Sequence, residues 1–176
     1  MHLLLSTTRL RKLEPEDAPN LYRFRNDPEV TRGLVGFSSG YSLQAIKEWI
    51  ERRDNIPGDL VWAIAERESN ACLGHAGLYR IDHRVRSCEF GILLGESSRW
   101  GKGIGKEVTA SIVAYGFDEL NMNRVELTVL ESNTRAIRLY EGLGFVREGL
   151  KRNAQYRAGE YLDVILMSIL RSERQK

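Results

Sequence analysis

The segment Trp100–Lys106 has residue types and a spacing suited to binding a phosphate group. It reads Trp-Gly-Lys-Gly-Ile-Gly-Lys, with glycine at every second position. Because glycine has no Cβ, the backbone N–H groups of such a turn can approach an anion closely. A strand is expected before the turn and a helix after it, and the amino end of a helix attracts negative charge. Lys102 and Lys106 add positive charge, so the sequence predicts an anion site here.

Two common phosphate-binding motifs do not fit this turn. A magnesium-nucleotide loop requires Gly-x-x-x-x-Gly-Lys followed by Ser or Thr, whose hydroxyl binds the metal. Here Lys106 is followed by Glu107, and Trp100 stands where the first glycine belongs. A dinucleotide fingerprint requires Gly-x-Gly-x-x-Gly, and counted from Gly101 its last glycine is missing. A tight turn that binds nothing stays open as the alternative.

A second block of residues lies downstream. It fits the pattern N-x-x-A-x-x-x-Y-x-x-x-G-F at Asn133, Ala136, Tyr140, Gly144 and Phe145. Together, the two blocks resemble the GNAT superfamily of N-acetyltransferases, whose pyrophosphate loop is usually Arg/Gln-x-x-Gly-x-Gly/Ala. The turn matches the two small positions of that loop, whereas a tryptophan replaces the usual Arg or Gln. The resemblance extends over nearly the whole chain.

The resemblance implies that acetyl-CoA is the co-substrate and that no metal ion takes part. In this family the strand before the turn separates from the next strand, and its exposed backbone pairs with the pantetheine amides like an added strand. The residues that the resemblance places at the cofactor are Ile92, Leu94, Trp100, Gly101, Lys102, Gly103, Ile104, Gly105, Lys106, Asn133, Arg135, Ala136 and Tyr140.

Tyr140 is the candidate acid. The reaction begins when a neutral amine attacks the thioester and ends when the CoA thiolate leaves. A phenol with an ordinary pKa of about 10 stays protonated near neutral pH and can donate to the leaving sulfur. The resemblance assigns this role to Tyr140. Core packing is the alternative, since Ile137 and Tyr140 share one face of the predicted helix. Asn133 is compatible both with a bond to the cofactor and with an N-cap.

Glu89 is the candidate base. It matches the strand position at which many family members carry a carboxylate that accepts the amine proton, often through water. A glutamate flanked by apolar residues on a central strand needs a partner or a chemical role. The sequence leaves open an ion pair with Arg80 or Arg86, and a water chain in place of Glu89.

The acceptor is expected to bind between the segments Asn26–Tyr41 and Lys151–Tyr161. Gly159–Val164 resembles spermidine acetyltransferases, while Phe24–Pro28 resembles enzymes that acetylate amino sugars of nucleotide-linked sugars. Trp100 is familiar in the branch that acetylates ribosomal-protein N-termini. We therefore expect direct attack, in a ternary complex, by a small-molecule amine (polyamine or amino sugar) or a protein N-terminal α-amine. A non-catalytic acyl-CoA-binding regulatory module is the alternative.

The elements that must position these residues follow from periodicity and turn signals. Asp27 and Ser42 suit helix N-caps, and Gly144 suits a helix C-cap. Strands are expected over 60–65, 73–81, 88–94, 124–130, 145–150 and 162–170, and helices over 103–120 and 133–143. The chain, residues 1–176, is expected to form a single domain of the α+β (mixed α/β) class. The resemblance implies a mostly antiparallel, twisted sheet of about seven strands that is flanked by helices and splayed at the cofactor site.

The composition excludes several other classes of protein. Lys and Arg number 26 and Asp and Glu 24, giving a net charge of +2 without a basic run, so no nucleic-acid partner is expected. The two cysteines, Cys72 and Cys88, lack metal-ligand or disulfide-scaffold spacing. No apolar run approaches the ~20 residues of a membrane helix. We expect a cytoplasmic protein with no membrane partner, and the sequence leaves a homodimer open.

Overall fold

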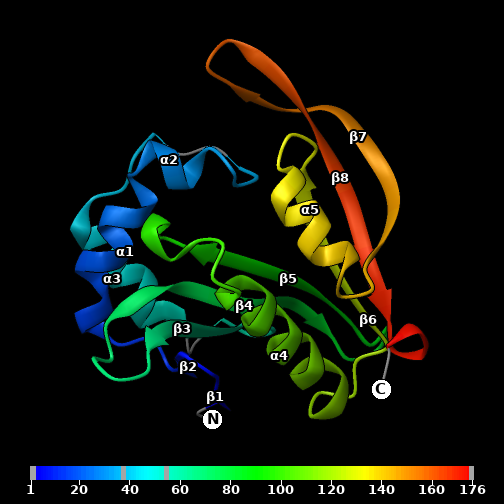
Figure 1. Ribbon diagram of the computed structural model, residues 1–176, viewed down its shortest axis with the longest axis horizontal. Coiled ribbons are helices and arrows are strands. Elements are labelled where there is room, and N and C mark those ends of the chain that lie inside the picture. Colours follow the sequence, from blue (N-terminus) through cyan, green and yellow to red (C-terminus); the bar gives the residue numbers. More distant parts are fainter. Residues whose placement is uncertain (1–2, 37–38, 54–55, 175–176) are drawn as a thin grey trace.

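The computed structural model describes residues 3–36, 39–53 and 56–174. Its centre is an eight-stranded sheet with the strand order β1-β2-β3-β4-β5-β6-β8-β7 (Figure 1). The strands are β1 (Leu3–Leu4), β2 (Thr8–Arg11), β3 (Leu60–Glu66), β4 (Cys72–Asp82), β5 (Ser87–Leu94), β6 (Arg124–Leu130), β7 (Val146–Arg157) and β8 (Glu160–Leu170). All neighbours are antiparallel except β5 and β6. The mixed α/β, mostly antiparallel prediction is confirmed, with the two-residue β1 added at the edge.

Helices cover both faces of the sheet. They are α1 (Ala18–Arg25), α2 (Pro28–Thr31), α3 (Leu43–Arg52), α4 (Ile104–Asp118) and α5 (Thr134–Glu141). One buried cluster packs α4 and α5 against one face, and a second packs α1 and α3 against Ala63 and Leu93 on the other. The sheet therefore lies between two helical layers (Figure 1).

The predicted helix starts are confirmed, whereas one predicted helix end is wrong. The Asp27 side chain accepts from the N–H of Glu29 at 2.8 Å, and the Ser42 hydroxyl from the N–H of Ala45 at 3.0 Å. Helix α5 ends at Glu141 with Gly142 as its cap, two residues before the predicted cap. Gly144 has a φ of +93° instead, so it turns the chain into β7 after the helix has ended.

The sheet splays between β5 and β6, as predicted. These strands pair only over the three residues Ser87–Glu89, opposite Arg124–Glu126. Beyond that point β5 continues to Leu94 and β6 to Leu130 without a shared ladder. One backbone edge of each strand therefore faces a gap, whose closed end lies at Glu89.

Strands β7 and β8 form a hairpin longer than the sequence indicates. We expected the first strand to end at 150, but it continues to Arg157 and turns at Ala158 and Gly159, which have φ values of 51° and 89°. Most of its residues are exposed, so no apolar alternation marks the extension. The hairpin tip extends past α2 and α5 at the top of Figure 1.

Candidate active site

The glycine-rich turn presents the amino end of α4. Gly101 and Gly103 have φ values of 77° and 83°, which side-chain-bearing residues rarely adopt. Gly103 is the N-cap of this 15-residue helix, and no side chain caps it. The one acidic residue of the first turn, Glu107, accepts instead from the backbone N–H and hydroxyl of Ser6, at 2.6 and 2.8 Å. The helix end therefore keeps N–H donors for an anion.

Trp100, which stands where the family usually has Arg or Gln, contacts both β5 and α5. Its Nε1–H donates to the carbonyl of Leu94 at 2.8 Å, which ties the turn to the end of β5. The guanidinium of Arg135, on α5, lies over the Trp100 ring, 4.5 Å from the ring centroid. A cation over an indole face is attracted by the ring electrons. Trp100 therefore brings a guanidinium from another element close to the turn.

Tyr140 lies on α5 with its ring in the core. It is 8% exposed and contacts Phe90 and Phe145, with ring centroids 6.4 and 5.8 Å away. Burial raises the pKa of Tyr140 to about 12. Within the described part of the chain, no residue hydrogen-bonds its hydroxyl. The predicted core packing is therefore present, and the hydroxyl keeps its proton available.

Asn133 caps α5 and joins it to the distant loop after α2. Its Oδ1 accepts from the N–H of Ala136 at 3.2 Å, and its Nδ2 donates to the carbonyl of Gly33 at 3.1 Å. The predicted N-cap is confirmed. Since Nδ2 carries two hydrogens, one N–H remains for another acceptor.

Glu89 forms one of the two ion pairs that the sequence left open. Its carboxylate pairs with Arg80, whereas Arg86 donates to the carbonyl and side-chain oxygen of Asn121, at 2.7 and 2.8 Å. The Glu89 side chain is 22% exposed, and it belongs to the last residue of β5 that pairs with β6. Neighbouring residues of a strand point to opposite faces. Glu89 and Phe90, and with Phe90 the ring of Tyr140, therefore lie on opposite sides of the sheet.

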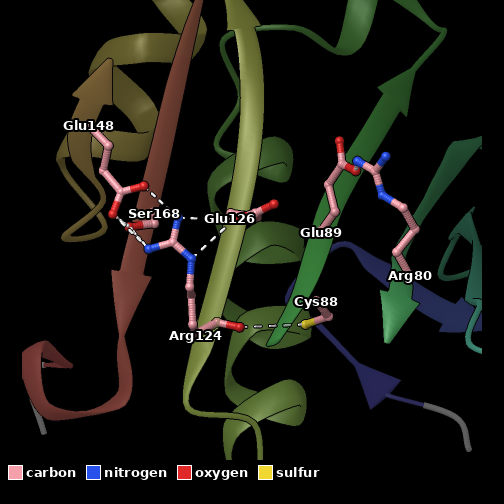
Figure 2. Close-up of polar contacts among 7 residues, drawn as sticks. All are labelled: Arg80, Cys88, Glu89, Arg124, Glu126, Glu148 and Ser168. Carbon is pink, nitrogen blue, oxygen red and sulfur yellow. Dashed lines mark hydrogen bonds and ion pairs between the residues drawn. The ribbon is translucent and has the colours of Figure 1, made fainter. Parts of the chain in front are cut away.

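Glu126 is a residue that sequence reasoning missed. It stands directly opposite Glu89 in the parallel register of β5 and β6, so the two carboxylates share one face at the closed end of the gap (Figure 2). Arg124 donates to Oε2 of Glu126 through Nε and Nη2, at 3.1 and 3.0 Å. The sequence shows Glu126 only as part of a strand pattern, because a register between distant strands leaves no local signal.

The Arg124 guanidinium also binds Glu148 on β7. The two contacts are 2.6 and 2.5 Å long, and the hydroxyl of Ser168 on β8 donates to the same carboxylate at 2.7 Å (Figure 2). The hydrogen bonds from Arg124 and Ser168 lower the pKa of Glu148 to about 2. One polar network thus links the three C-terminal strands next to Glu126.

The two predicted acceptor segments lie beside each other. The guanidinium of Arg157 donates to the carbonyls of Thr31, Leu34 and Gly36, each at 2.9 Å. The side-chain oxygen of Gln155 accepts from the N–H of Gly36 at 3.0 Å. Residues 37 and 38 of the first segment lie outside the described residues. The β7–β8 hairpin and the loop after α2 are therefore held together by hydrogen bonds.

Comparison with known proteins now identifies the family. A family model described as an acetyltransferase (GNAT) domain matches residues 8–146. The chain belongs to this GNAT family. The protein is thus an N-acetyltransferase, and the resemblance of its two blocks to this family is confirmed.

Several GNAT relatives are similar along nearly the whole chain. An uncharacterized N-acetyltransferase, p20 of Bacillus licheniformis, is 32% identical, with 93% of each chain covered. The spermidine N(1)-acetyltransferase of Vibrio cholerae is 28% identical, again over 93% of each chain. A structure of spermidine N-acetyltransferase from Vibrio cholerae in complex with CoA and spermine superposes with a TM-score of 0.87 at 26% identity, covering 96% of this chain and 98% of the other.

Two findings bear on metals and membranes. Among residues 3–36, 39–53 and 56–174, no group of three or more His, Cys, Asp or Glu side chains is placed to hold a metal ion. In the same ranges, no helix of this GNAT chain is long and apolar enough to cross a membrane.

Proposed function

We propose that this enzyme transfers an acetyl group from acetyl-CoA to a primary amine, which attacks directly within a ternary complex. The observation that carries the proposal is the gap between β5 and β6, which has the glycine-rich turn at its open end and two carboxylates at its closed end. It gives one route for an extended cofactor and one place for an attacking amine.

The residues around the gap fit acetyl-CoA, which supplies an activated acetyl thioester. The turn Gly101–Lys106, its two lysines and Arg135 offer N–H donors and positive charge for the pyrophosphate. The unpaired edge of β5 at Ile92 and Leu94 offers backbone groups for the pantetheine amides. The Leu94 carbonyl accepts from Trp100 and has a second lone pair left.

Tyr140 stabilises the leaving thiolate by donating a hydrogen bond. A phenol with a pKa of about 12 keeps its proton throughout the neutral range. Full transfer of that proton to a thiolate with an ordinary pKa of about 8.5 is unfavourable. The hydroxyl therefore acts by donating to the developing negative charge, which is present only late in the reaction.

Glu89 and Glu126 face the amine from the other side of the sheet. An amine with a pKa of about 10.4 costs about 4–5 kcal/mol to deprotonate at pH 7, and an α-amine of about 8 costs about 1.4 kcal/mol. Each carboxylate has an ion pair through one oxygen, to Arg80 or Arg124, which leaves the other oxygen to accept from an ammonium or a water. We assign proton acceptance to Glu89 and amine positioning to Glu126.

The names of the relatives support a primary amine as the acceptor. Two similar enzymes are spermidine acetyltransferases, and a third, 26% identical, is a putative ribosomal N-acetyltransferase of Bacillus subtilis. A polyamine, an amino sugar and a peptide α-amine are therefore the first acceptors to test.

The test is release of CoA thiol from acetyl-CoA over a panel of these amines and of free amino acids, with the product identified by mass spectrometry. We expect acetylated product from at least one class, and none from a secondary amide of the same size. Tight acetyl-CoA binding without turnover on any amine would contradict the proposal and favour an acyl-CoA-binding regulatory module.

A further inference from the structure

A partly buried arginine lies against two aromatic rings on the acceptor side of the sheet. Arg25, the last residue of α1, lies with its guanidinium carbon 5.3 Å from the ring centre of Tyr41 and 4.7 Å from that of Trp49. One nitrogen, Nη2, is 3.0 Å from Nε2 of His75 on β4. Arg53 stacks on the same Trp49 ring at 4.8 Å. We call these five residues the Arg25 site.

The histidine of the Arg25 site is neutral. Burial lowers the pKa of His75 well below its usual value, and the charges of Arg25 and Arg53 lower it further. A guanidinium can only donate, so Nε2 accepts from Arg25 and the ring proton lies on Nδ1. His75 is 5% exposed, and Nδ1 has no partner among the described residues. The site therefore holds a buried donor that no group in the described part of the chain satisfies.

The Arg25 site carries more positive than negative charge. Arg53 pairs with Asp59 at 3.3 Å, and both side chains are mostly buried. Arg25 forms no ion pair within the described chain. The Nε groups of both arginines are buried and without a hydrogen-bond partner there. A guanidinium partly removed from water without a counter-charge is costly, so an anion that binds beside Arg25 supplies the charge that it lacks.

The Arg25 site lies on the same face of the sheet as the carboxylates at the closed end of the gap. His75 and Tyr79 lie on one face of β4, and Tyr79 stands opposite Glu89 in the register of β4 and β5. Between them, Gly77 and Gly91 also stand opposite each other and carry no side chain. A Cβ on either glycine would lie within 3.2 Å of the Tyr79 ring, so this ring lies over the two glycines. It therefore covers the stretch of sheet between Glu89 and His75.

We propose, building on the function proposed above, that the Arg25 site binds an anionic group of the acceptor, either a carboxylate or a phosphate. The amine end of the same molecule then lies at Glu89 and Glu126. Such an acceptor carries both charges, ammonium and anion, as an amino acid or an amine phosphate does. A polyamine has no group for the Arg25 site, and its second ammonium meets two guanidinium groups instead.

The test compares acceptors that share one amine and differ in the other end: ethanolamine, phosphoethanolamine, β-alanine and diaminopropane. We expect kcat/KM for at least one anionic member to exceed that for ethanolamine by about 10-fold or more, with the diamine lowest. The phosphate and carboxylate members separate the two sources of the anion. Arg25→Gln is expected to lower kcat/KM for the anionic acceptor by about 10- to 100-fold and to leave ethanolamine within a factor of two.

Two further variants serve as controls for Arg25→Gln. Arg52→Gln removes the same charge from an exposed arginine of α3 whose ion pair is with Glu48, and it is expected to leave all four kcat/KM values unchanged. Arg25→Lys keeps the charge but loses the planar fork, so it is expected to recover part of the preference. Equal loss for all four acceptors in Arg25→Gln, or a wild-type preference for ethanolamine or the diamine, would overturn the inference. Either outcome requires acetyl transfer, and so leaves the proposed function standing.

Discussion

The two faces of the sheet at the gap are built by different means. On the face of α4 and α5, the proposed cofactor site consists of backbone donors in one turn and of residues on one following helix. On the face of α1 and α3, the proposed acceptor site consists of side chains from two helices, a loop and three strands. One site depends on local conformation, and the other on tertiary assembly.

This difference has a chemical reason. A pyrophosphate is recognised by N–H groups and a helix end, which neighbours in the sequence can supply together. An acceptor is recognised by the placement of a few charges, and residues 25, 53, 75, 89 and 126 come close only when the chain has folded. The cofactor side can therefore be shared among enzymes while the acceptor side changes.

The strongest test of the cofactor face is the removal of one hydroxyl. Tyr140→Phe is expected to lower kcat by about 100-fold, because the donor to the leaving thiolate is lost while the ring packing against Phe90 and Phe145 remains. Steady-state kinetics measures kcat, and calorimetry measures the Kd for acetyl-CoA, which should stay within about twofold. An unchanged kcat would leave Tyr140 as a core residue alone.

The carboxylates test the acceptor face. Glu89→Gln and Glu126→Gln are each expected to lower kcat/KM for an amine of pKa near 10 by about 10-fold or more at pH 7, since less of the amine is held and deprotonated. The loss should shrink as the pH rises toward the amine pKa, which a pH–rate profile measures.

Glu148→Gln is the matched control for these variants. It removes a carboxylate that also pairs with Arg124 but lies on the side of Arg124 away from Glu89 (Figure 2). If it lowered kcat/KM as much as Glu126→Gln did, Glu126 would be a structural partner of Arg124 and not a positioning residue.

Trp100 tests whether the cofactor face depends on more than the turn itself. Trp100→Phe removes the hydrogen bond to Leu94 and weakens the platform for Arg135. We expect the Kd for acetyl-CoA to rise by about threefold to tenfold, from one hydrogen bond and one cation–π contact. Arg135→Gln alone should raise the Kd for acetyl-CoA by part of this amount. In the double variant it should raise the Kd little beyond the value for Trp100→Phe, which calorimetry can measure. Full additivity would mean that the two residues act separately.

The sequence predicts the elements of the cofactor face well because their signals are short. The cap at Asn133 and the strand before the turn follow from residue type and period. The splay and the roles at Tyr140 came from resemblance, not from periodicity. Gly144 misled the prediction of a helix end, because a left-handed glycine follows the cap there by two residues.

The acceptor face is poorly predicted for the opposite reason. The sequence indicates Glu89 and leaves Arg80 as one possible partner, but nothing local shows that Glu126 stands opposite Glu89. In the sequence, Arg25 is an ordinary charged residue near the end of a predicted helix. Only the folded chain places the rings of Tyr41 and Trp49 against it. The extension of β7 escaped notice because exposed strands lack apolar alternation.

The smallest effect expected concerns the network that holds the C-terminal strands beside the acceptor face. The pKa of Glu148 is depressed from 4.5 to about 2 in the folded protein, chiefly by the hydrogen bond from Arg124. Its stabilising contribution is therefore fully present above pH 4.5 and is lost as the pH falls toward 2. Urea unfolding should show Glu148→Gln less stable than wild type at pH 7, with the difference shrinking below pH 4. Because the carboxylate is partly exposed, high salt should reduce the difference as well. A difference that stayed constant from pH 7 to pH 3 would mean that packing, and not charge, accounts for what Glu148 contributes between β7 and β6.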